Sequence, residues 1–387
     1  MSDWKTYKLG DLINVKHGFA FKGEFFSEEP TTNILLTPGN FKIGGGFKTD
    51  KLKYYNGEVP QDYVLNEGDI LITMTDLSKA GDTLGYSAKI PAHEAIRYLH
   101  NQRLGLVQFK NEDIDTDFLY WVLRTKPYQY FIVSSATGST VKHTSPTRIC
   151  GYEFEAPEDK ATQKKIAQIL TSLDDKIELN LQMNQTLEAM ALAIFKEWFV
   201  NFNFPGFDGE LVDGLPKGWR KGSVGEMISF KNGKSSPERN DDFQYPVFGS
   251  NGVIGYSEDF NAKENISIVG RVGSFCGSTY LSTKKCWVTD NAIIAQSKND
   301  YSIFTYLTLL NLNLNNFRAG SGQPLLNQTI LSAIPLNIPS TDLLEEFENL
   351  TMPYFKKIEL NLDTNKELEN IRNATLPKLM SGQLEIA

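Results

Sequence analysis

Two lysines and an asparagine lie close together in the stretch FKNGKS, residues 230–235: Lys231, Asn232 and Lys234. Ammonium and amide groups commonly hydrogen-bond the phosphates of nucleic acids, so these three residues are candidate phosphate contacts. The stretch NGKS also resembles the end of a nucleotide-binding P-loop motif. Ile228 occupies the place of that motif's first glycine, however, which excludes a P-loop.

A second candidate group surrounds Arg271, which lies between glycines in GRVGSFCGS, residues 270–278. An arginine that donates two hydrogen bonds to guanine discriminates that base by about 1–3 kcal/mol. Glycines let the backbone come close to a ligand, so Arg271 and Ser274 are candidate base contacts. The glycine-rich loop YPVFGSNGVIGY adds Ser250 and Asn251. The alternative is that Arg271 is a surface residue in a salt bridge.

The first half of the chain offers a similar polar set, and two loops that precede helices match each other between the halves. The alternative is that these loop residues are polar only because they face solvent, as loop residues usually do. The further candidates for contact with nucleic acid are Lys16, His17, Thr75, Ser139, Thr140, Lys142, His143, Ser321 and Gln323.

The sequence shows no pattern typical of catalysis or of a metal site. It contains neither a PD…ExK nuclease arrangement nor an NPPY-type methyltransferase motif, and its four histidines have no metal-ligand spacing. The three cysteines form no CxxC pair, which favours a reducing compartment and no structural zinc. We therefore expect a recognition protein without catalytic residues or a metal.

The chain is a tandem repeat of two units. The six residues KIELNL occur at 176–181 and again at 357–362, an offset of 181. Further matches lie upstream at offsets of 182, 186 and 215: 138–157 with 320–339, 117–123 with 303–309, and 4–18 with 219–233. Because the offset falls along the unit, the first variable segment is 34 residues longer than the second. Thr75 stands roughly opposite Arg271 in this alignment.

Each unit ends in a segment whose apolar residues recur at spacings of three and four, the pattern of a coiled coil. Each such helix exposes an apolar stripe, and the other helix is its simplest partner. We expect an antiparallel pair with a pseudo-twofold axis, in which helices of about 40 residues span about 60 Å. Pro353 and Pro377 are expected to break or kink the second helix. The residues expected to pair the helices are Ile177, Asn180, Asn184, Leu187, Ile358, Asn361, Asn365 and Leu368.

The net charge of −8 is unevenly distributed. The helical segments 158–214 and 339–387 carry −5 and −4, whereas residues 215–338 carry +3 and residues 1–157 carry −2. The near-neutral segments can therefore gather their basic residues on one face toward phosphates. These two variable segments alternate short β-rich runs with turn residues, so we expect mixed α/β domains.

The order of several stretches resembles the specificity subunits of type I restriction-modification systems. The resemblance rests on IFKEWFVNFNFPG (194–206), LPKGWRKGSVGEM (215–227), ATLPKLMSGQLEI (374–386), and ISIVGRVGSFCGS with WVTDNAIIA (266–278 and 287–295). It implies an α/β mixed fold with two α+β target recognition domains separated by two long antiparallel helices. The implied boundaries are 1–157 and 219–339 for the domains, 158–204 and 340–387 for the helices, and 205–218 for a linker.

The resemblance also implies partners and cofactors. Each domain would read one half of a split double-stranded DNA target, and the helices would set the spacer. They would dock two methyltransferase subunits, which bind S-adenosylmethionine, and restriction translocase/nuclease subunits, which use ATP and Mg. The chain itself would bind no cofactor, contact no membrane and be cytoplasmic. The alternatives are the specificity subunit of a type II-like combined enzyme and a coiled-coil scaffold that does not bind DNA.

Overall fold

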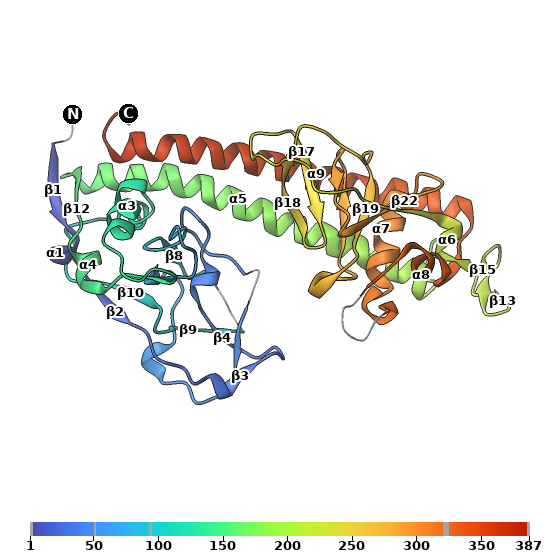
Figure 1. The fold of residues 1–387 in the computed structure, drawn as a ribbon, viewed down its shortest axis with the longest axis horizontal. Coiled ribbons are helices and arrows are strands. Elements are labelled where there is room, and N and C mark those ends of the chain that lie inside the picture. Colours follow the sequence, from blue (N-terminus) through green and yellow to red (C-terminus); the bar gives the residue numbers. More distant parts are fainter. Residues whose placement is uncertain (1–2, 50–51, 93–94, 320–324, 385–387) are drawn as a thin grey trace. The chain divides into compact units, whose positions relative to one another are not determined.

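A computed structural model describes residues 3–49, 52–92, 95–319 and 325–384. The chain divides into two compact units (Figure 1). The first unit comprises Met1–Ile177 and Lys366–Ala387, and the second comprises Glu178–Asn365. Each unit therefore contains one variable segment and parts of both long helices.

The first unit is built on a four-stranded antiparallel sheet in the order β2-β10-β6-β8. Its strands are β2 (Ile13–His17), β10 (Leu104–Phe109), β6 (Ile70–Thr73) and β8 (Ser87–Lys89). A second sheet has the order β3-β5-β4-β9, with β3 (Phe26–Ser27), β5 (Tyr54–Tyr55), β4 (Asn33–Leu35) and β9 (Arg97–Leu99). Two strand pairs complete the unit: β1 (Trp4–Lys8) with β12 (Glu153–Pro157), and β7 (Thr75–Asp76) with β11 (Lys142–His143).

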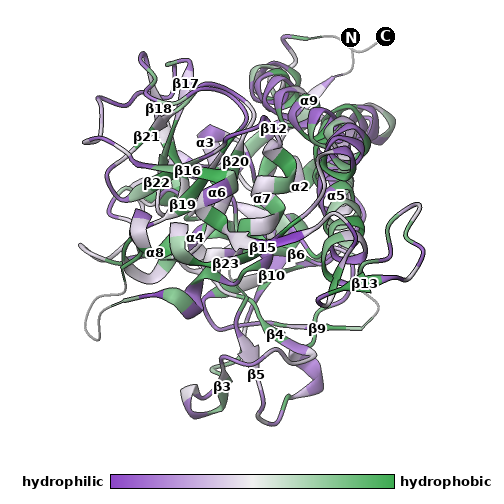
Figure 2. Cartoon of the chain, turned by 90° about the vertical axis from the view of Figure 1, so that its right-hand side faces the viewer, coloured by the Kyte–Doolittle hydropathy of each residue, from purple (hydrophilic) through white to green (hydrophobic). Residues whose placement is uncertain are grey.

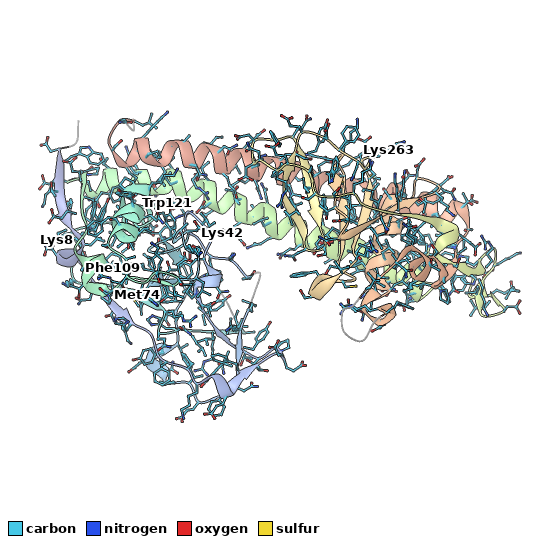
Figure 3. The ribbon with its side chains drawn as sticks, viewed as in Figure 1. Lys8, Lys42, Met74, Phe109, Trp121 and Lys263 are labelled. Atoms are coloured by element: carbon cyan, nitrogen blue, oxygen red, sulfur yellow. The ribbon has the colours of Figure 1, made fainter. Side chains whose placement is uncertain are left out.

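Alternation along the strands divides the core of the first unit into two layers. Ile70 and Ile72 of β6 pack in one buried cluster with Trp121 of helix α2 (Thr116–Val122), which Figure 3 labels. Leu71 lies on the other face and packs with Ile34 of the second sheet. The sheet β2-β10-β6-β8 thus lies between the sheet β3-β5-β4-β9 on one face and four helices on the other. These helices are α1 (Leu9–Leu12), α2 (Thr116–Val122), α3 (Lys126–Ser134) and α4 (Pro146–Cys150).

The second unit has a four-stranded sheet of the same kind, in the order β16-β22-β19-β20. Its strands are β16 (Ile228–Asn232), β22 (Ala292–Ser297), β19 (Ile266–Gly270) and β20 (Thr279–Ser282). The three-stranded sheet is β18 (Gly252–Ser257), β17 (Tyr245–Gly249) and β21 (Trp287–Val288), and the strand pairs are β13 (Leu211–Val212) with β14 (Leu215–Pro216), and β15 (Arg220–Ser223) with β23 (Pro335–Ile338). The short helices are α6 (Val224–Met227), α7 (Ser302–Asn311) and α8 (Gln328–Ala333).

The stretch YPVFGSNGVIGY is a β-hairpin of β17 and β18 and not the open loop that its glycines suggested. Val247 and Phe248 are buried on β17, and Gly252 has a φ of +80° just after the Ser250–Asn251 turn. A left-handed residue beside a two-residue turn matches the twist of the strands, which explains why a glycine-rich stretch forms a hairpin here.

The expected duplication is confirmed by the strand register. At an offset of 215, β2 falls on β16, and both are followed by a glycine, Gly18 and Gly233. A Cβ atom on Gly18 would lie 2.1 Å from the Asn101 carbonyl oxygen, and one on Gly233 would lie 2.1 Å from the Thr289 oxygen. No side chain fits at that distance, so the same close backbone contact explains the same glycine in both copies.

The two long helices are α5 (Lys160–Phe195) and α9 (Thr341–Met380), and in Figure 2 hydrophilic and hydrophobic residues alternate along both. A π-helical turn, Lys196–Val200, follows α5 directly. Of the expectation that Pro353 and Pro377 break or kink the second helix, the break is wrong, because α9 is continuous through both. Each proline removes one backbone donor. Burial of Phe347 and Phe355, on either side of Pro353, and of Leu379, just after Pro377, stabilises the helix there.

Candidate nucleic-acid interface

In the second unit, one edge of the four-stranded sheet gathers most of the predicted residues. Lys231 and Asn232 end β16 and lie opposite Ile294 and Ile293 of β22. The next strand of the sheet, β19, ends directly before Arg271. The exposed side chains of Lys231, Asn232 and Lys234 and the half-buried Arg271 therefore come from the same-edge ends of two strands, β16 and β19, that are separated by β22.

Arg271 is held by its backbone and leaves most of its guanidinium available. Its backbone N–H donates to the Asn291 carbonyl at 2.9 Å, and Leu326 donates to its carbonyl at 3.0 Å. The guanidinium makes one long hydrogen bond, 3.5 Å to the Asp290 carbonyl. Its buried Nε has no hydrogen-bond partner among the described residues. Such a side chain can still donate to a base edge or a phosphate, and the expected alternative of a salt bridge is not formed within the described residues.

Two loops beside Arg271 bring further predicted residues to this edge. A Cβ atom on Gly270 would lie 2.9 Å from the Ser250 oxygen and 2.2 Å from the Phe275 oxygen. The β17–β18 turn with Ser250 and Asn251 therefore lies against the 3₁₀ turn Gly273–Phe275, which carries the exposed Ser274. Ser321 and Gln323 lie outside the described residues.

Arg318 belongs to the same loops, and the sequence patterns missed it. Its Nη2 donates to the Cys276 carbonyl at 2.6 Å, and the Cys276 thiol in turn contacts the Arg271 carbonyl at 3.1 Å. The following residue, Ala319, pairs with Leu325. The signal that could have found Arg318 is its position just before the stretch 320–339, which matches residues 138–157.

In the first unit, the corresponding hairpin assembles several predicted residues. Thr137 pairs with His143 across a turn that contains the exposed Ser139 and Thr140. Lys142 and His143 form β11 and pair with β7, and the Thr75 hydroxyl lies 3.2 Å from Nδ1 of His143. Thr75 is buried, so its hydroxyl supports the histidine rather than facing solvent.

Lys16 and His17 end β2, the equivalent of β16, and His17 is exposed. Lys16 is partly engaged, because its ammonium donates to the Asp62 carbonyl at 2.8 Å and lies 4.7 Å from the Tyr63 ring centre. The neighbouring His100 is fully buried, and burial lowers its pKa to about 4. His100 is therefore a neutral core residue that adds no charge to this edge.

The strand register corrects the alignment of Thr75 with Arg271. Met74 donates its N–H to the Arg103 carbonyl and accepts from Thr144. Arg271 makes the same two bonds, to Asn291 and from Leu326. The structural equivalent of Arg271 is therefore Met74, which Figure 3 labels. Loop lengths differ between the copies, so sequence similarity alone left the alignment one residue out.

The four predicted asparagines pair across the helices inside the second unit. The Asn180 amide donates to Oδ1 of Asn365 at 2.7 Å, and the Asn361 amide donates to Oδ1 of Asn184 at 2.8 Å. All four side chains are buried. Higher numbers on α5 face lower numbers on α9, so the two helices are antiparallel here. The other predicted positions, Ile177, Leu187, Ile358 and Leu368, are buried or half-buried.

Within the described residues, no group of three or more His, Cys, Asp or Glu side chains could hold a metal ion. The thiols of Cys150, Cys276 and Cys286 are free. In the part of the chain that the structure describes, no helix combines the length and apolar character that a bilayer crossing needs.

Comparison with known proteins finds one family for most of the chain, together with relatives and a solved structure of similar fold. A family model described as the type I restriction modification DNA specificity domain matches residues 1–189 and 216–370. The specificity subunit of the type I restriction enzyme MjaIX of Methanocaldococcus jannaschii is 24% identical over 314 residues, which cover 71% of this chain and 70% of that protein. The HindI specificity subunit of Haemophilus influenzae is 29% identical over 52% of this chain and 42% of its own length. The crystal structure of a type I restriction-modification S subunit from M. genitalium matches all of this chain and 97% of that one, with a TM-score of 0.59 and 16% identity.

Proposed function

Since the chain belongs to the family of type I restriction-modification DNA specificity domains, we propose that each of its two units reads one half of a split double-stranded DNA target. Residues 1–157 and 219–339 are the two recognition domains, 158–204 and 340–387 supply the helices, and 205–218 link them. The chain selects the sequence, and the chemistry belongs to its partner subunits.

The observation that carries this proposal is the repetition of one polar sheet edge in both units. In the first unit, the ends of β2 and β6 and the hairpin at Thr137–His143 meet at this edge. In the second unit, the ends of β16 and β19 and the paired residues Ala319 and Leu325 do the same. In the second unit this edge carries Lys231, Lys234, Arg271 and Arg318, within a segment of net charge +3. Basic groups on exposed loops supply the phosphate contacts that dominate DNA affinity.

The two edges differ at the positions most suited to reading bases. Lys16 and Lys231 are equivalent and identical, as expected of phosphate contacts. His17 is replaced by Asn232, and Met74 is replaced by Arg271. The half-buried Arg271 can favour guanine, whereas the buried Met74 offers no side chain to a base, so the two half-sites have different sequences. We propose that Arg271 reads one base of the second half-site.

Exposed apolar positions on the helices support the docking of two copies of a methyltransferase subunit. Leu179 on α5 is 52% exposed, and its repeat equivalent on α9, Leu360, is 57% exposed. Single exposed apolar residues are ordinary, but here the exposure recurs at the same repeat position. Two further equivalent pairs are also exposed: Ile169 with Leu350, and Met190 with Ile371. The methyltransferase subunits bring S-adenosylmethionine, and restriction translocase/nuclease subunits bring ATP and Mg.

The stoichiometry is tested by charge substitution at the equivalent positions. Leu179→Asp and Leu360→Asp should each leave a complex with one methyltransferase subunit, and the double variant should bind none. Sedimentation of the purified complexes measures the composition. Gln182→Asp, an exposed polar position on α5, is the control. Loss of both subunits from a folded single variant would contradict two equivalent docking sites.

Sequence selection is tested by detecting N6-methyladenine in genomic DNA of the source organism, with and without this gene. A split, asymmetric methylated motif that disappears on deletion is the expected result. An unchanged methylome, together with DNA binding that shows no sequence preference at any salt concentration, would favour the scaffold. If one partner chain both methylates and cleaves, the type II-like organisation holds.

A further inference from the structure

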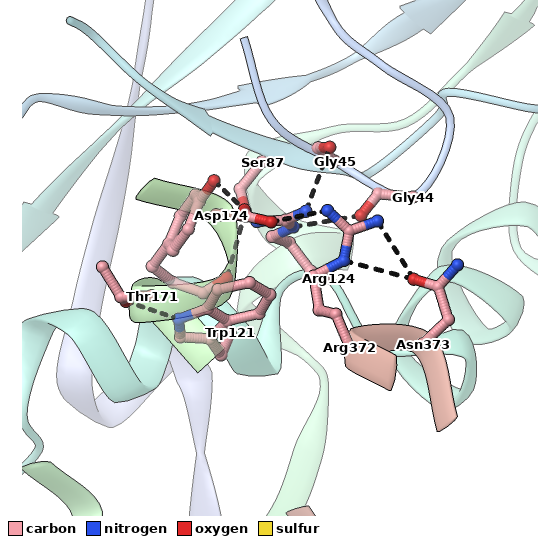
Figure 4. Close-up of polar contacts among 10 residues, drawn as sticks. Gly44, Gly45, Ser87, Trp121, Arg124, Thr171, Asp174, Arg372 and Asn373 are labelled. Carbon is pink, nitrogen blue, oxygen red and sulfur yellow. Dashed lines mark hydrogen bonds and ion pairs between the residues drawn. The ribbon is translucent and has the colours of Figure 1, made fainter. Parts of the chain in front are cut away.

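A buried arginine lies where the first variable segment meets the long helices of its own unit. Arg124 follows α2 and is 3% exposed. Its guanidinium donates to the Tyr120 hydroxyl at 3.0 Å, to the Gly44 carbonyl at 3.0 Å and to the Gly45 carbonyl at 3.3 Å (Figure 4). It also bonds Asp174 of α5 and lies 4.2 Å from the Trp121 ring centre.

Asp174 is shared between two arginines. One carboxylate oxygen accepts from Arg124, and the other accepts from Nη1 of Arg372 on α9. The remaining groups of Arg372 donate to Oδ1 of Asn373. Burial by itself raises the pKa of Asp174, but the charges and hydrogen bonds of the two arginines outweigh it and hold that pKa below its ordinary value. The charged triad thus links α2, α5, α9 and the loop at Gly44–Gly45.

The loop at Gly44–Gly45 is shaped around Arg124. Gly44, Gly45 and Gly46 all have positive φ angles, of 85°, 86° and 100°. A Cβ atom on Gly45 would lie 2.6 Å from Cγ of Arg124. The Gly46 N–H donates to the Ser87 carbonyl at 2.8 Å, which ties the loop to β8. The arginine therefore holds the backbone beside the edge strand of the sheet β2-β10-β6-β8, in addition to its contact with a neighbouring helix.

The second copy of the repeat replaces the arginine–carboxylate triad by apolar residues and one hydrogen bond, which the Tyr306 hydroxyl donates to the Glu188 carboxylate of α5. At the offset of 186, Tyr120 falls on Tyr306 and Arg124 on Leu310; at the offset of 181, Asp174 falls on Phe355 and Arg372 on Ala191. Phe355 and Ala191 are buried in one apolar cluster. The rings of Tyr306 and Phe355 lie 5.9 Å apart at 84°. The apolar part of this contact tolerates small sliding movements, whereas the arginine–carboxylate hydrogen bonds of the first copy require defined directions.

We propose that Arg124, Asp174 and Arg372 form a positioning device that fixes the first recognition domain on its helix segments, and so sets which spacer between the two half-sites is accepted. This inference rests on the proposed function. Arg124 acts through the orientation of the domain and not by touching DNA, because its guanidinium is buried and each of its three nitrogens bonds a protein group.

The test uses the complex with its methyltransferase subunits and a set of DNA targets. The targets carry both native half-sites with the native spacer or with one base pair added or removed. Arg124→Leu introduces the residue of the second copy. The variant Arg124→Leu/Asp174→Phe/Arg372→Ala introduces the whole apolar set and leaves no buried charge unpaired, so it serves if the single variant fails to fold. Lys284→Ala, which removes the exposed Lys284–Asp363 bridge of the second unit, is the control.

The expected result is a tenfold or greater loss of discrimination between spacers in both Arg124 variants, with base discrimination inside each half-site unchanged within twofold. The control should keep wild-type discrimination. Unchanged spacer discrimination in the folded triple variant overturns the proposal. Loss of base discrimination in the first half-site alone, with the spacer still selected, also overturns it. Failure of the wild-type complex to methylate any split target would instead refute the proposed function.

Discussion

Two double variants with the same composition would measure how much the asparagine pairing stabilises the helix pair. Asn184→Leu with Asn361→Leu removes one hydrogen-bonded pair completely and leaves Asn180 bonded to Asn365. Asn184→Leu with Asn365→Leu removes one member of each pair. Both replace two buried amides by two leucines, so their difference isolates the pairing.

The magnitude follows from the donors that lose their acceptors. In the mismatched variant the amides of Asn180 and Asn361 lose the oxygens that they bond, and both residues are about 1–2% exposed. Each buried donor without an acceptor costs about 1–3 kcal/mol, so the mismatched variant should be about 2–6 kcal/mol less stable than the matched one. At 1.4 kcal/mol per tenfold, 2 kcal/mol is about a 30-fold change in an opening constant.

Native-state hydrogen exchange of peptides from α5 and α9 is the suitable assay, because it reports local opening in a chain with two units. The mismatched variant should exchange faster in these peptides by at least about 30-fold. Equal exchange in the two double variants would refute the pairing. The matched variant should keep a stable helix pair but lose one of the two polar pairs that fix register, so we expect more than one oligomeric state in sedimentation.

Three further predictions concern single residues. Arg271→Ala should relax one base position of one half-site by about 1–3 kcal/mol, measured as methylation of a library of targets, and a uniform loss at every position would mark a phosphate contact instead. Gly233→Ala should destabilise the second unit by about 1–3 kcal/mol in thermal unfolding because its Cβ meets a backbone carbonyl, whereas Gly23→Ala, whose nearest neighbour would be 3.9 Å away, should change little. Asp174 has a lowered pKa, so its ionised carboxylate stabilises the fold above the ordinary carboxyl pKa of 3.8, and this stability is lost as the pH falls below that value. The difference in unfolding temperature between wild type and Asp174→Asn should therefore shrink on acidification, and a growing difference would contradict the ion triad.

Local patterns were sufficient to predict the repeat, the two helices and the class of the variable segments. The spacing of Ile177, Asn180 and Asn184 is a property of one helix, so periodicity reveals it without any tertiary contact. The matched glycines Gly18 and Gly233 likewise mark a conformation that each copy needs for itself. Periodicity also outweighed the helix-breaking tendency of Pro353, because the flanking Phe347 and Phe355 are buried.

The candidate interface was only partly predictable. The charges and turn residues of the second unit, such as Lys231 and Arg271, stand out in the sequence. Arg318 does not, because its place beside Arg271 depends on a hairpin and on the Cys276 carbonyl 42 residues away. The equivalence of Met74 with Arg271 likewise depends on hydrogen bonds between strands, which similarity between stretches of unequal length cannot supply.

The sequence by itself determined that this protein is a duplicated chain with two variable segments and two amphipathic helices, since repeats and periodicity are written in neighbouring residues. Only the tertiary structure decided which asparagine bonds which, and that Arg124 is buried against Asp174 and not free for DNA. Such contacts join residues that are 50 to 185 positions apart. Their geometry is set by the packing of whole elements, and no local pattern encodes it.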